Sequence, residues 1–269
     1  MTGKADPALV ELLARRIEAW RSPDRMFVLG ICGAQGSGKS TLVTSLAARL
    51  ADAGLKTACL SLDDLYLTRA ERLRMADRIH PLFATRGVPG THDTDLGLET
   101  IAALQRGEAA AMPRFDKGAD DRVAPVNWPR APAGCAVLLF EGWCLGAAPQ
   151  DTAALAEPVN ALEVGEDPEG IWRGQVNAAL AGPYQALWRR IDRLVLLAAP
   201  DWEIVARWRE EQEEQLRASG AERAMSPPQV LRFIQHYERL TRHVLAEMPG
   251  RADLVLRLGA DRSVIANPG

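Results

Sequence analysis

A glycine-rich stretch near the start of the chain has the composition of a phosphate-binding loop. Residues 33–40 read G-A-Q-G-S-G-K-S and fit the pattern G-x-x-x-x-G-K-[ST] at every required position. Its glycines would let backbone N–H groups converge on phosphate oxygens without obstruction by a Cβ atom. We predict that Lys39 is catalytic through the β- and γ-phosphates of ATP and that the Ser40 hydroxyl binds Mg²⁺. The predicted nucleotide-binding residues here are Gly33, Ala34, Gln35, Gly36, Ser37, Gly38, Lys39, Ser40 and Thr41.

Carboxylates follow two apolar runs further along the chain. Asp63 and Asp64 come at the end of the run 57–62, and Glu141 follows the run 136–140. Phosphoryl transfer to a hydroxyl needs an oxygen that holds the metal and a carboxylate that orients or deprotonates the acceptor. We therefore predict Asp63 as the catalytic base and Glu141 as a catalytic and metal-binding residue. Whether Asp64 rather than Asp63 is the base stays open, because two adjacent carboxylates cannot both aim at one centre. Caps and turns are the alternative, because acidic residues often follow strands for that purpose.

These residues need a scaffold that brings strand ends together. Apolar runs that are typical of buried strands occupy residues 26–32, 57–62, 136–140, 192–198 and 253–258. Between and around them lie segments with helical spacing, at 8–20, 39–52, 202–218 and 227–247. Such alternation predicts a doubly wound α/β fold with a parallel five-stranded sheet and helices on both faces. Ligands of this architecture gather at the carboxyl ends of the strands.

One long region departs from the alternation. Residues 65–133 are rich in Arg, Asp, Gly and Pro, with a helical pattern only around 95–106. We interpret this region as a substrate-binding insertion within a single domain that spans residues 1–269. A second irregular stretch, 147–170, is rich in Ala, Glu and Pro and is interpreted as a surface excursion.

Composition limits the partners and the compartment. The net charge of -3 gives no broad attraction for nucleic acid, so we expect a small-molecule partner instead. Charges interrupt the first twenty residues, unlike a secretory signal, and no segment resembles a membrane span. The four cysteines lie far apart, and His80, His236 and His243 form no metal-ligand pattern. We expect a reduced, cytoplasmic protein.

Several further segments resemble D-glycerate 3-kinases, which are related to uridine kinase, phosphoribulokinase and bacterial pantothenate kinase. Residues 61–68 (S-L-D-D-L-Y-L-T) resemble their S-x-D-D-F-Y-L-T element, and residues 86–93 (R-G-V-P-G-T-H-D) resemble their R-G-x-x-G-T-H-D segment. Residues 115–117 with Asp121-Arg122 are similar to their Y-D-K-S and G-D-R elements, and residues 140–146 match F-E-G-W-M-L-G. A W-R-x-x-Q-E pattern starts at Trp208.

The resemblance implies a P-loop kinase that phosphorylates D-glycerate with ATP, with Asp63 in the place of the catalytic base. It also implies a substrate-binding set on the matching segments, namely Asp64, Tyr66, Arg86, Thr91, His92, Asp93, Lys117, Arg122 and Trp143. The chain departs from the family pattern at Gly118, where Ser is usual, and at Leu65, where Phe is usual.

The residues alone fit an anionic acceptor, since a carboxylate needs cationic or N–H donors. Arg86, His92, Lys117 and Arg122 could supply them, although Arg86 and Lys117 could equally be surface charges. His92 could be a turn residue, and Trp143 could serve packing.

The charged helix 202–218 carries Arg207 and Arg209. It is either a solvated face or a lid that closes an arginine over the phosphates.

Two other functions remain open at this stage. The acceptor could be a nucleoside, a pantothenate-like acid or a sugar. A nucleotide-dependent switch or ATPase without a small acceptor is the alternative from a different class. A GTPase is disfavoured because the chain has no N-K-x-D element, and the segment 116–120 has neither its Asn nor its spacing.

Overall fold

The computed structural model describes residues 5–218 and 225–265. Five parallel strands form the central sheet in the order β2-β5-β1-β6-β7. Their bounds are β1 Phe27–Gly33, β2 Thr57–Ser61, β5 Val137–Gly142, β6 Arg193–Ala198 and β7 Leu254–Arg257. All residues of β1 and β5 are buried, as a parallel sheet covered on both faces requires. The predicted fold class is confirmed, and each predicted strand agrees with the observed one to within a residue or two.

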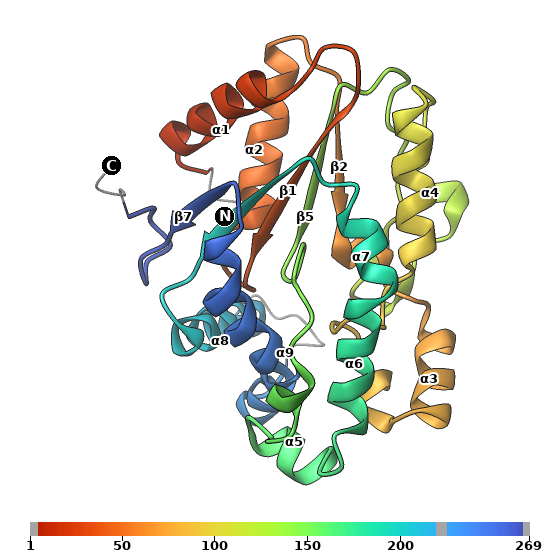
Figure 1. Ribbon diagram of the computed structural model, residues 1–269, viewed down its shortest axis with the longest axis vertical. Coiled ribbons are helices and arrows are strands. Elements are labelled where there is room, and N and C mark those ends of the chain that lie inside the picture. Colours follow the sequence, from red (N-terminus) through yellow and green to blue (C-terminus); the bar gives the residue numbers. More distant parts are fainter. Residues whose placement is uncertain (1–4, 219–224, 266–269) are drawn as a thin grey trace.

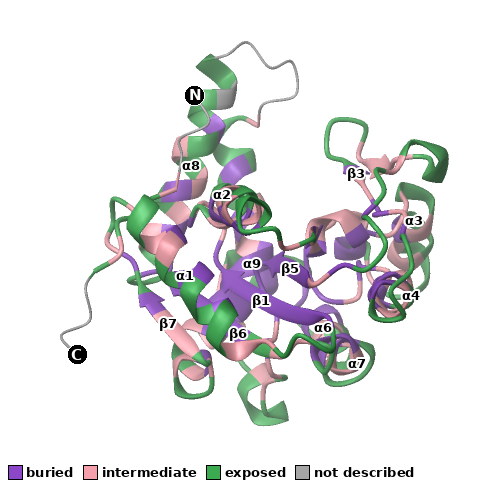
Figure 2. Cartoon of the chain, turned by 90° about the horizontal axis from the view of Figure 1, so that it is seen from above, coloured by how far each residue is buried: buried purple, intermediate pink, exposed green. Residues whose placement is uncertain are grey.

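Helices cover the strands from two sides (Figure 1). Helices α1 and α2 lie on one side of the strands in this view, and α4, α6 and α7 lie on the other. Figure 2 shows the strands buried in the middle and the outer faces of the helices exposed, with α8 projecting from the body of the molecule. The helix bounds are α1 Pro7–Trp20, α2 Lys39–Asp52, α3 Arg69–Arg78, α4 Thr94–Gln105, α5 Ala161–Glu166, α6 Ile171–Ala181, α7 Pro183–Trp188, α8 Trp202–Ala218 and α9 Pro227–Glu247. Short 3₁₀ helices are η1 Leu62–Leu65, η2 Pro81–Ala84, η3 Pro125–Asn127, η4 Thr152–Leu155 and η5 Met248–Gly250.

Register places the candidate residues at one edge of the sheet. Strand β5 lies between β2 and β1, so that Glu141 is paired with Ser61 on one side and with Ile31 on the other. The phosphate loop leaves β1 two residues after Ile31. Parallel strands end at the same edge, and the carboxyl ends of three strands therefore meet beside the glycine-rich loop.

The insertion 65–133 contains a helix that the sequence analysis missed. Helix α3 has a capping box formed by Thr68 and Glu71, but its one buried residue is Arg72. The Arg72 guanidinium donates to three backbone carbonyls, those of Leu67, Ala84 and Asp120. An inward-facing arginine removes the apolar periodicity on which helix prediction depends, and this explains the omission. A two-stranded ribbon, β3 Phe115–Asp116 and β4 Asp121–Arg122, completes the insertion.

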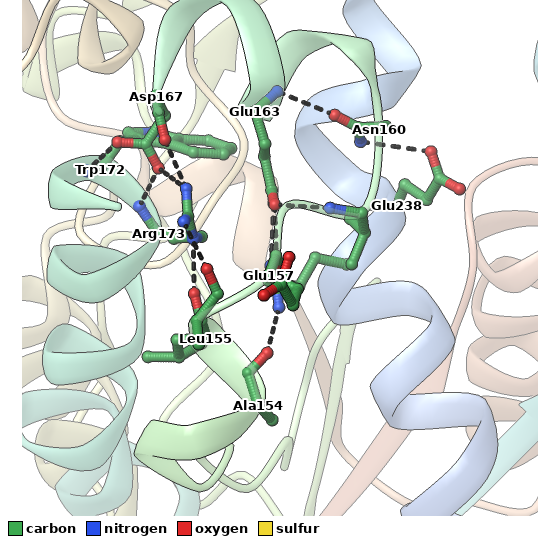
Figure 3. A network of polar contacts seen from close by, with 12 residues as sticks. Ala154, Leu155, Glu157, Asn160, Glu163, Asp167, Trp172, Arg173 and Glu238 are labelled. Atoms are coloured by element: carbon green, nitrogen blue, oxygen red, sulfur yellow. Dashed lines mark hydrogen bonds and ion pairs between the residues drawn. The ribbon is translucent and has the colours of Figure 1, made fainter. Parts of the chain in front are cut away.

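Residues 147–170 lie largely at the surface, as interpreted, but buried ion pairs fasten the stretch to the body of the protein. Glu163 and Asp167 in this stretch are 0% and 1% exposed. Arg239 of α9 donates two hydrogen bonds to Glu163, at 2.8 and 2.6 Å, and further ones to backbone carbonyls of the stretch. Asp167 forms a second buried ion pair, at 3.0 Å, with Arg173. Figure 3 shows this network, which fastens the stretch to α6 and α9.

Within the ranges 5–218 and 225–265, no helix is long and apolar enough to cross a membrane.

Candidate active site

The glycine-rich loop connects β1 to the amino end of α2. Gly36 and Gly38 have φ angles of 79° and 86°, which favour glycine. Gly36 is also sterically required, because a Cβ atom there would lie 2.6 Å from the Cβ atom of Trp208 in α8. Gly38 is the N-cap of α2, so the loop delivers the unpaired N–H groups of the first helical turn to one place.

The loop fits a polyphosphate. The buried hydroxyl Oγ of Ser37 has no hydrogen-bond partner, which is costly unless a ligand or a water supplies one. The Lys39 ammonium donates to the Ala34 carbonyl at 3.1 Å and is thus held over the loop. Together with the helix terminus, these groups form a concave, positively polarised surface for an anion.

Glu141 is the penultimate residue of β5, lies next to this loop and is 8% exposed. Its Oε1 atom accepts hydrogen bonds from Ser40 Oγ at 2.9 Å and from Ser61 Oγ at 3.1 Å. Carboxylate and hydroxyl oxygens are the donors that Mg²⁺ prefers, usually in company with water and substrate phosphates. Ser40 and Glu141 therefore fit the predicted metal, and Ser61 orients the carboxylate.

Asp63 lies in η1, directly after β2. Its two oxygens accept hydrogen bonds from the Tyr66 hydroxyl at 2.8 Å and from the Lys117 ammonium at 2.6 Å. Burial by itself would raise the pKa of Asp63, but Lys117 and Tyr66 outweigh it and lower the pKa to about 2. This carboxylate is therefore charged at any physiological pH.

Asp64 has different partners, although it is adjacent in sequence. Its carboxylate accepts from Arg114 Nη1 at 3.1 Å and from the backbone N–H of Phe115 at 3.1 Å. Burial raises the pKa of Asp64, and Arg114 opposes this effect. The two neighbouring aspartates consequently serve separate parts of the site.

The phosphate loop, Asp63 and Glu141 open onto one cleft of about 860 Å³. Its lining residues are Gln35, Gly36, Lys39, Ser40, Ser61, Asp63, Asp64, Tyr66, Arg86, Arg114, Lys117, Glu141, Trp143, Arg209, Gln212, Gln215, Phe233 and Tyr237. The structure thus brings the nucleotide loop and much of the predicted acceptor set to the same space. Such a volume suits a nucleotide together with a small acceptor.

Four residues of the predicted substrate-binding set do not line this cleft. Thr91 is 0% exposed, and its hydroxyl donates to the Val88 carbonyl. Burial lowers the pKa of His92 to about 3, and its ring stacks on Tyr66 with centroids 4.5 Å apart. Asp93 and Arg122 are the other two.

Asp93 caps α4 and forms an ion pair with Arg122 at 3.1 Å. Arg122 also donates to the Tyr66 carbonyl at 3.0 Å. These contacts place His92, Asp93 and Arg122 behind Tyr66, where they support the cleft wall.

Several known proteins are similar to this chain in sequence or in structure. Residues 28–157 match the model of the phosphoribulokinase/uridine kinase family. An uncharacterized kinase of Schizosaccharomyces pombe, mug58, is 36% identical over 241 residues, which is 85% of each chain. The chloroplastic D-glycerate 3-kinase of Arabidopsis thaliana is 34% identical over 78% of this chain, and the match spans 46% of that longer protein. The structure of D-glycerate 3-kinase from Cryptococcus neoformans superposes with a TM-score of 0.81 at 25% identity, covering 97% of this chain and 99% of that one.

The chain belongs to the D-glycerate 3-kinase family. It is therefore a kinase that uses ATP to phosphorylate a hydroxyl group of a small molecule.

In this kinase, α8 occupies the segment 202–218, for which the sequence left a solvated face and a lid as alternatives. Arg209 lines the cleft, where Glu213 binds it at 2.6 Å and its guanidinium lies 5.5 Å from the centre of the Phe233 ring. Arg207 is exposed and does not line the cleft. Of the two predicted arginines, Arg209 is therefore the one that lines the cleft.

Sequence reasoning missed several residues that line the cleft of the kinase. They are Ser61, Arg114, Gln212, Gln215, Phe233 and Tyr237. Phe233 and Tyr237 come from α9, where their spacing is that of an ordinary apolar face, so no pattern distinguished them from core residues. Ser61 and Gln212 did carry a signal, because both belong to segments that resemble the family.

Proposed function

We propose that this kinase transfers the γ-phosphoryl group of ATP to a hydroxyl of D-glycerate. The observation that supports this acceptor is the group of three cations, Arg86, Arg114 and Lys117, that line the cleft with Asp63. A small hydroxy acid offers a carboxylate for the cations and a hydroxyl for Asp63. Each of these cations already pairs with an aspartate, Arg86 with Asp120, Arg114 with Asp64 and Lys117 with Asp63. Guanidinium and ammonium groups carry several N–H donors, so each can also bind a substrate carboxylate as a second partner. A nucleoside or an uncharged sugar would leave those further donors unused, and this favours glycerate over those alternatives.

Residues of the phosphate loop bind the nucleotide in this proposal. Backbone N–H groups and Lys39 hold the phosphates, and Ser40 and Glu141 would hold Mg²⁺, which neutralises charge on the β- and γ-oxygens when bound. Arg209 adds a positive charge above the phosphates. Transfer then depends mainly on alignment and charge, because the transition state of phosphoryl transfer is loose.

Asp63 acts on the acceptor hydroxyl. A carboxylate with a pKa of about 2 is a weak base, so it works chiefly by accepting a hydrogen bond that aims the hydroxyl oxygen at the γ-phosphorus. As the new O–P bond forms and the bond to ADP breaks, the hydroxyl proton passes to Asp63 and then to water. Tyr66 and Lys117 keep the carboxylate in place meanwhile.

The acceptor is tested by measuring ADP release with purified kinase, ATP and Mg²⁺. We would compare D-glycerate, L-glycerate, uridine, pantothenate, a hexose and no acceptor. The expected result is the highest kcat/KM with D-glycerate and little release without an acceptor. A higher kcat/KM with uridine, pantothenate or the hexose would overturn the glycerate assignment, and fast acceptor-independent release would favour an ATPase switch. The cytoplasmic location and the lack of a nucleic-acid partner stay predictions.

A further inference from the structure

Two aspartates that are adjacent in the chain support one hairpin at two points. Asp63 binds Lys117, which lies just after β3, while Asp64 binds Arg114 and the backbone N–H of Phe115, just before and within β3. The same short segment is thus held at its start by one aspartate and supplies a cation to the other. This arrangement links the side chain of Asp64 to the surroundings of Asp63 by way of the hairpin.

Other contacts also hold the hairpin, since the buried Phe115 ring packs against Tyr66 and lies near the guanidinium groups of Arg72 and Arg86. None of these contacts involves the Lys117 side chain. Asp116 closes the hairpin turn by accepting from the N–H groups of Gly118 and Ala119, at 2.8 and 3.1 Å. The β4 side is fastened separately, because Asp121 accepts from the backbone N–H of Arg69. Lys117 has a side chain that is 61% exposed, so packing does not fix its position. On the β3 side, Asp64 supplies the hydrogen bonds that tie the strand to η1.

We propose that Asp64 is a positioning residue that fixes β3 against η1 and thereby places the Lys117 ammonium on the Asp63 carboxylate. Asp64 does not act on the acceptor in this arrangement. Its effect on transfer comes through Lys117, which keeps Asp63 charged and aimed. The inference rests on the proposed role of Asp63 but not on the identity of the acceptor.

Other charged and titratable groups also face Asp63, and none of them replaces Lys117. The Tyr66 hydroxyl donates to it, and the buried His92 ring, whose pKa is lowered to about 3, is neutral at physiological pH. The buried Tyr237 hydroxyl and Cys144 thiol also stay neutral, because burial raises the pKa of each. Asp64 itself is a neighbouring negative charge when ionised. Among these groups, loss of Lys117 should therefore change the pKa of Asp63 the most.

The first test reads Asp63 directly, without substrate. Protein labelled with ¹³C at aspartate carboxyls is titrated by NMR, and the Asp63 signal is identified by its absence in Asp63→Asn. In the wild type this signal should not titrate between pH 8 and pH 4. Both Asp64→Asn and Lys117→Ala should bring a titration into that window, whereas Asp77→Asn, an exposed control in α3, should not.

Titration of the Asp63 signal in Asp64→Asn would support a positioning role for Asp64. A folded Asp64→Asn protein in which the Asp63 signal stays flat overturns the proposal. If Asp64→Asn does not fold, Arg114→Gln removes the side-chain partner of Asp64 instead. A titrating Asp63 signal in this variant supports the proposal, and a flat signal overturns it.

The second test is a double-mutant cycle on kcat with the best acceptor of the panel. If Asp64 acts through Lys117, kcat of the double variant Asp64→Asn/Lys117→Ala should stay within about twofold of Lys117→Ala alone. If the reductions in kcat caused by the two single substitutions multiply in the double variant, Asp64 acts independently of Lys117 and the proposal is overturned. Failure of D-glycerate as a substrate changes neither test, because the titration needs no acceptor and the cycle uses whichever acceptor is turned over.

Discussion

At the scale of single residues, the catalytic importance of Asp63 is the sharpest prediction. Asp63→Asn replaces a charged acceptor by a neutral amide and should reduce kcat about 10²–10⁴-fold at saturating acceptor. The thermal unfolding midpoint should change little in comparison. Near-normal turnover by Asp63→Asn would show that its carboxylate does not orient the hydroxyl.

Lys39→Ala should reduce kcat about 10²–10³-fold, because it removes a cation that is directed at the phosphates.

His92 predicts a pH dependence of stability. Its folded pKa of about 3 is below the usual value of about 6.5, so the unfolded chain binds a proton that the folded chain does not. Stability from this residue is therefore complete above pH 6.5 and is lost as the pH falls from 6.5 towards 3. Urea unfolding of wild type and His92→Gln at pH 7, 6 and 5 should give a smaller loss per pH unit for the variant. Equal slopes would contradict the burial of a neutral imidazole.

At the scale of elements, the network of Figure 3 should be an important contribution to stability. Arg239→Ala leaves Glu163 buried without its partner and should cost about 3–5 kcal/mol of unfolding free energy. Arg232→Ala is a matched control on the same helix, because its pair with Glu166 is about half exposed on both sides and should be worth no more than about 1 kcal/mol. Chemical denaturation measures both values. Equal losses would mean that the buried pair contributes no more than the surface pair.

Helix α8 contains a second matched pair. Arg209→Ala should lower kcat about 10²-fold or more, because this arginine lines the cleft. Arg207→Ala changes an exposed arginine two positions earlier and should leave kcat and the KM for ATP nearly unchanged. Steady-state kinetics with varied ATP distinguishes the two. The reverse result would identify Arg207 as the residue that reaches the phosphates.

At the scale of the whole molecule, nucleotide binding should stabilise the fold. ATP with Mg²⁺ at about 100 times its Kd adds about 2.7 kcal/mol, which for a chain of this size raises the midpoint by roughly 5–10 °C. Gly36→Val should abolish this shift, since the valine side chain would clash with Trp208 of α8 and distort the phosphate loop. Thermal unfolding with and without ligand, and with Mg²⁺ replaced by EDTA, measures each contribution. An undiminished shift in Gly36→Val would contradict binding at residues 33–40.

Much of this protein was determined by local sequence. The five strands, the glycine-rich loop and the carboxylates at the ends of two strands were predicted because each depends on residues close together in the chain. A strand needs its own apolar run, and the loop needs glycines at Gly36 and Gly38, where φ is positive. These requirements are intrinsic to the backbone, so they are visible without a partner.

Tertiary structure alone decided which polar residues share the cleft. Arg72 and Arg239 have the sequence character of surface charges, yet both are buried because distant carbonyls and a carboxylate satisfy them. His92 and Arg122 were predicted to bind substrate, but they lie behind Tyr66. Asp63 and Asp64 have different partners, Lys117 and Arg114, because a hairpin about fifty residues further along the chain supplies both. Long-range contacts of this kind leave no local periodicity, because the energy of a buried charge depends on the partner that the fold supplies.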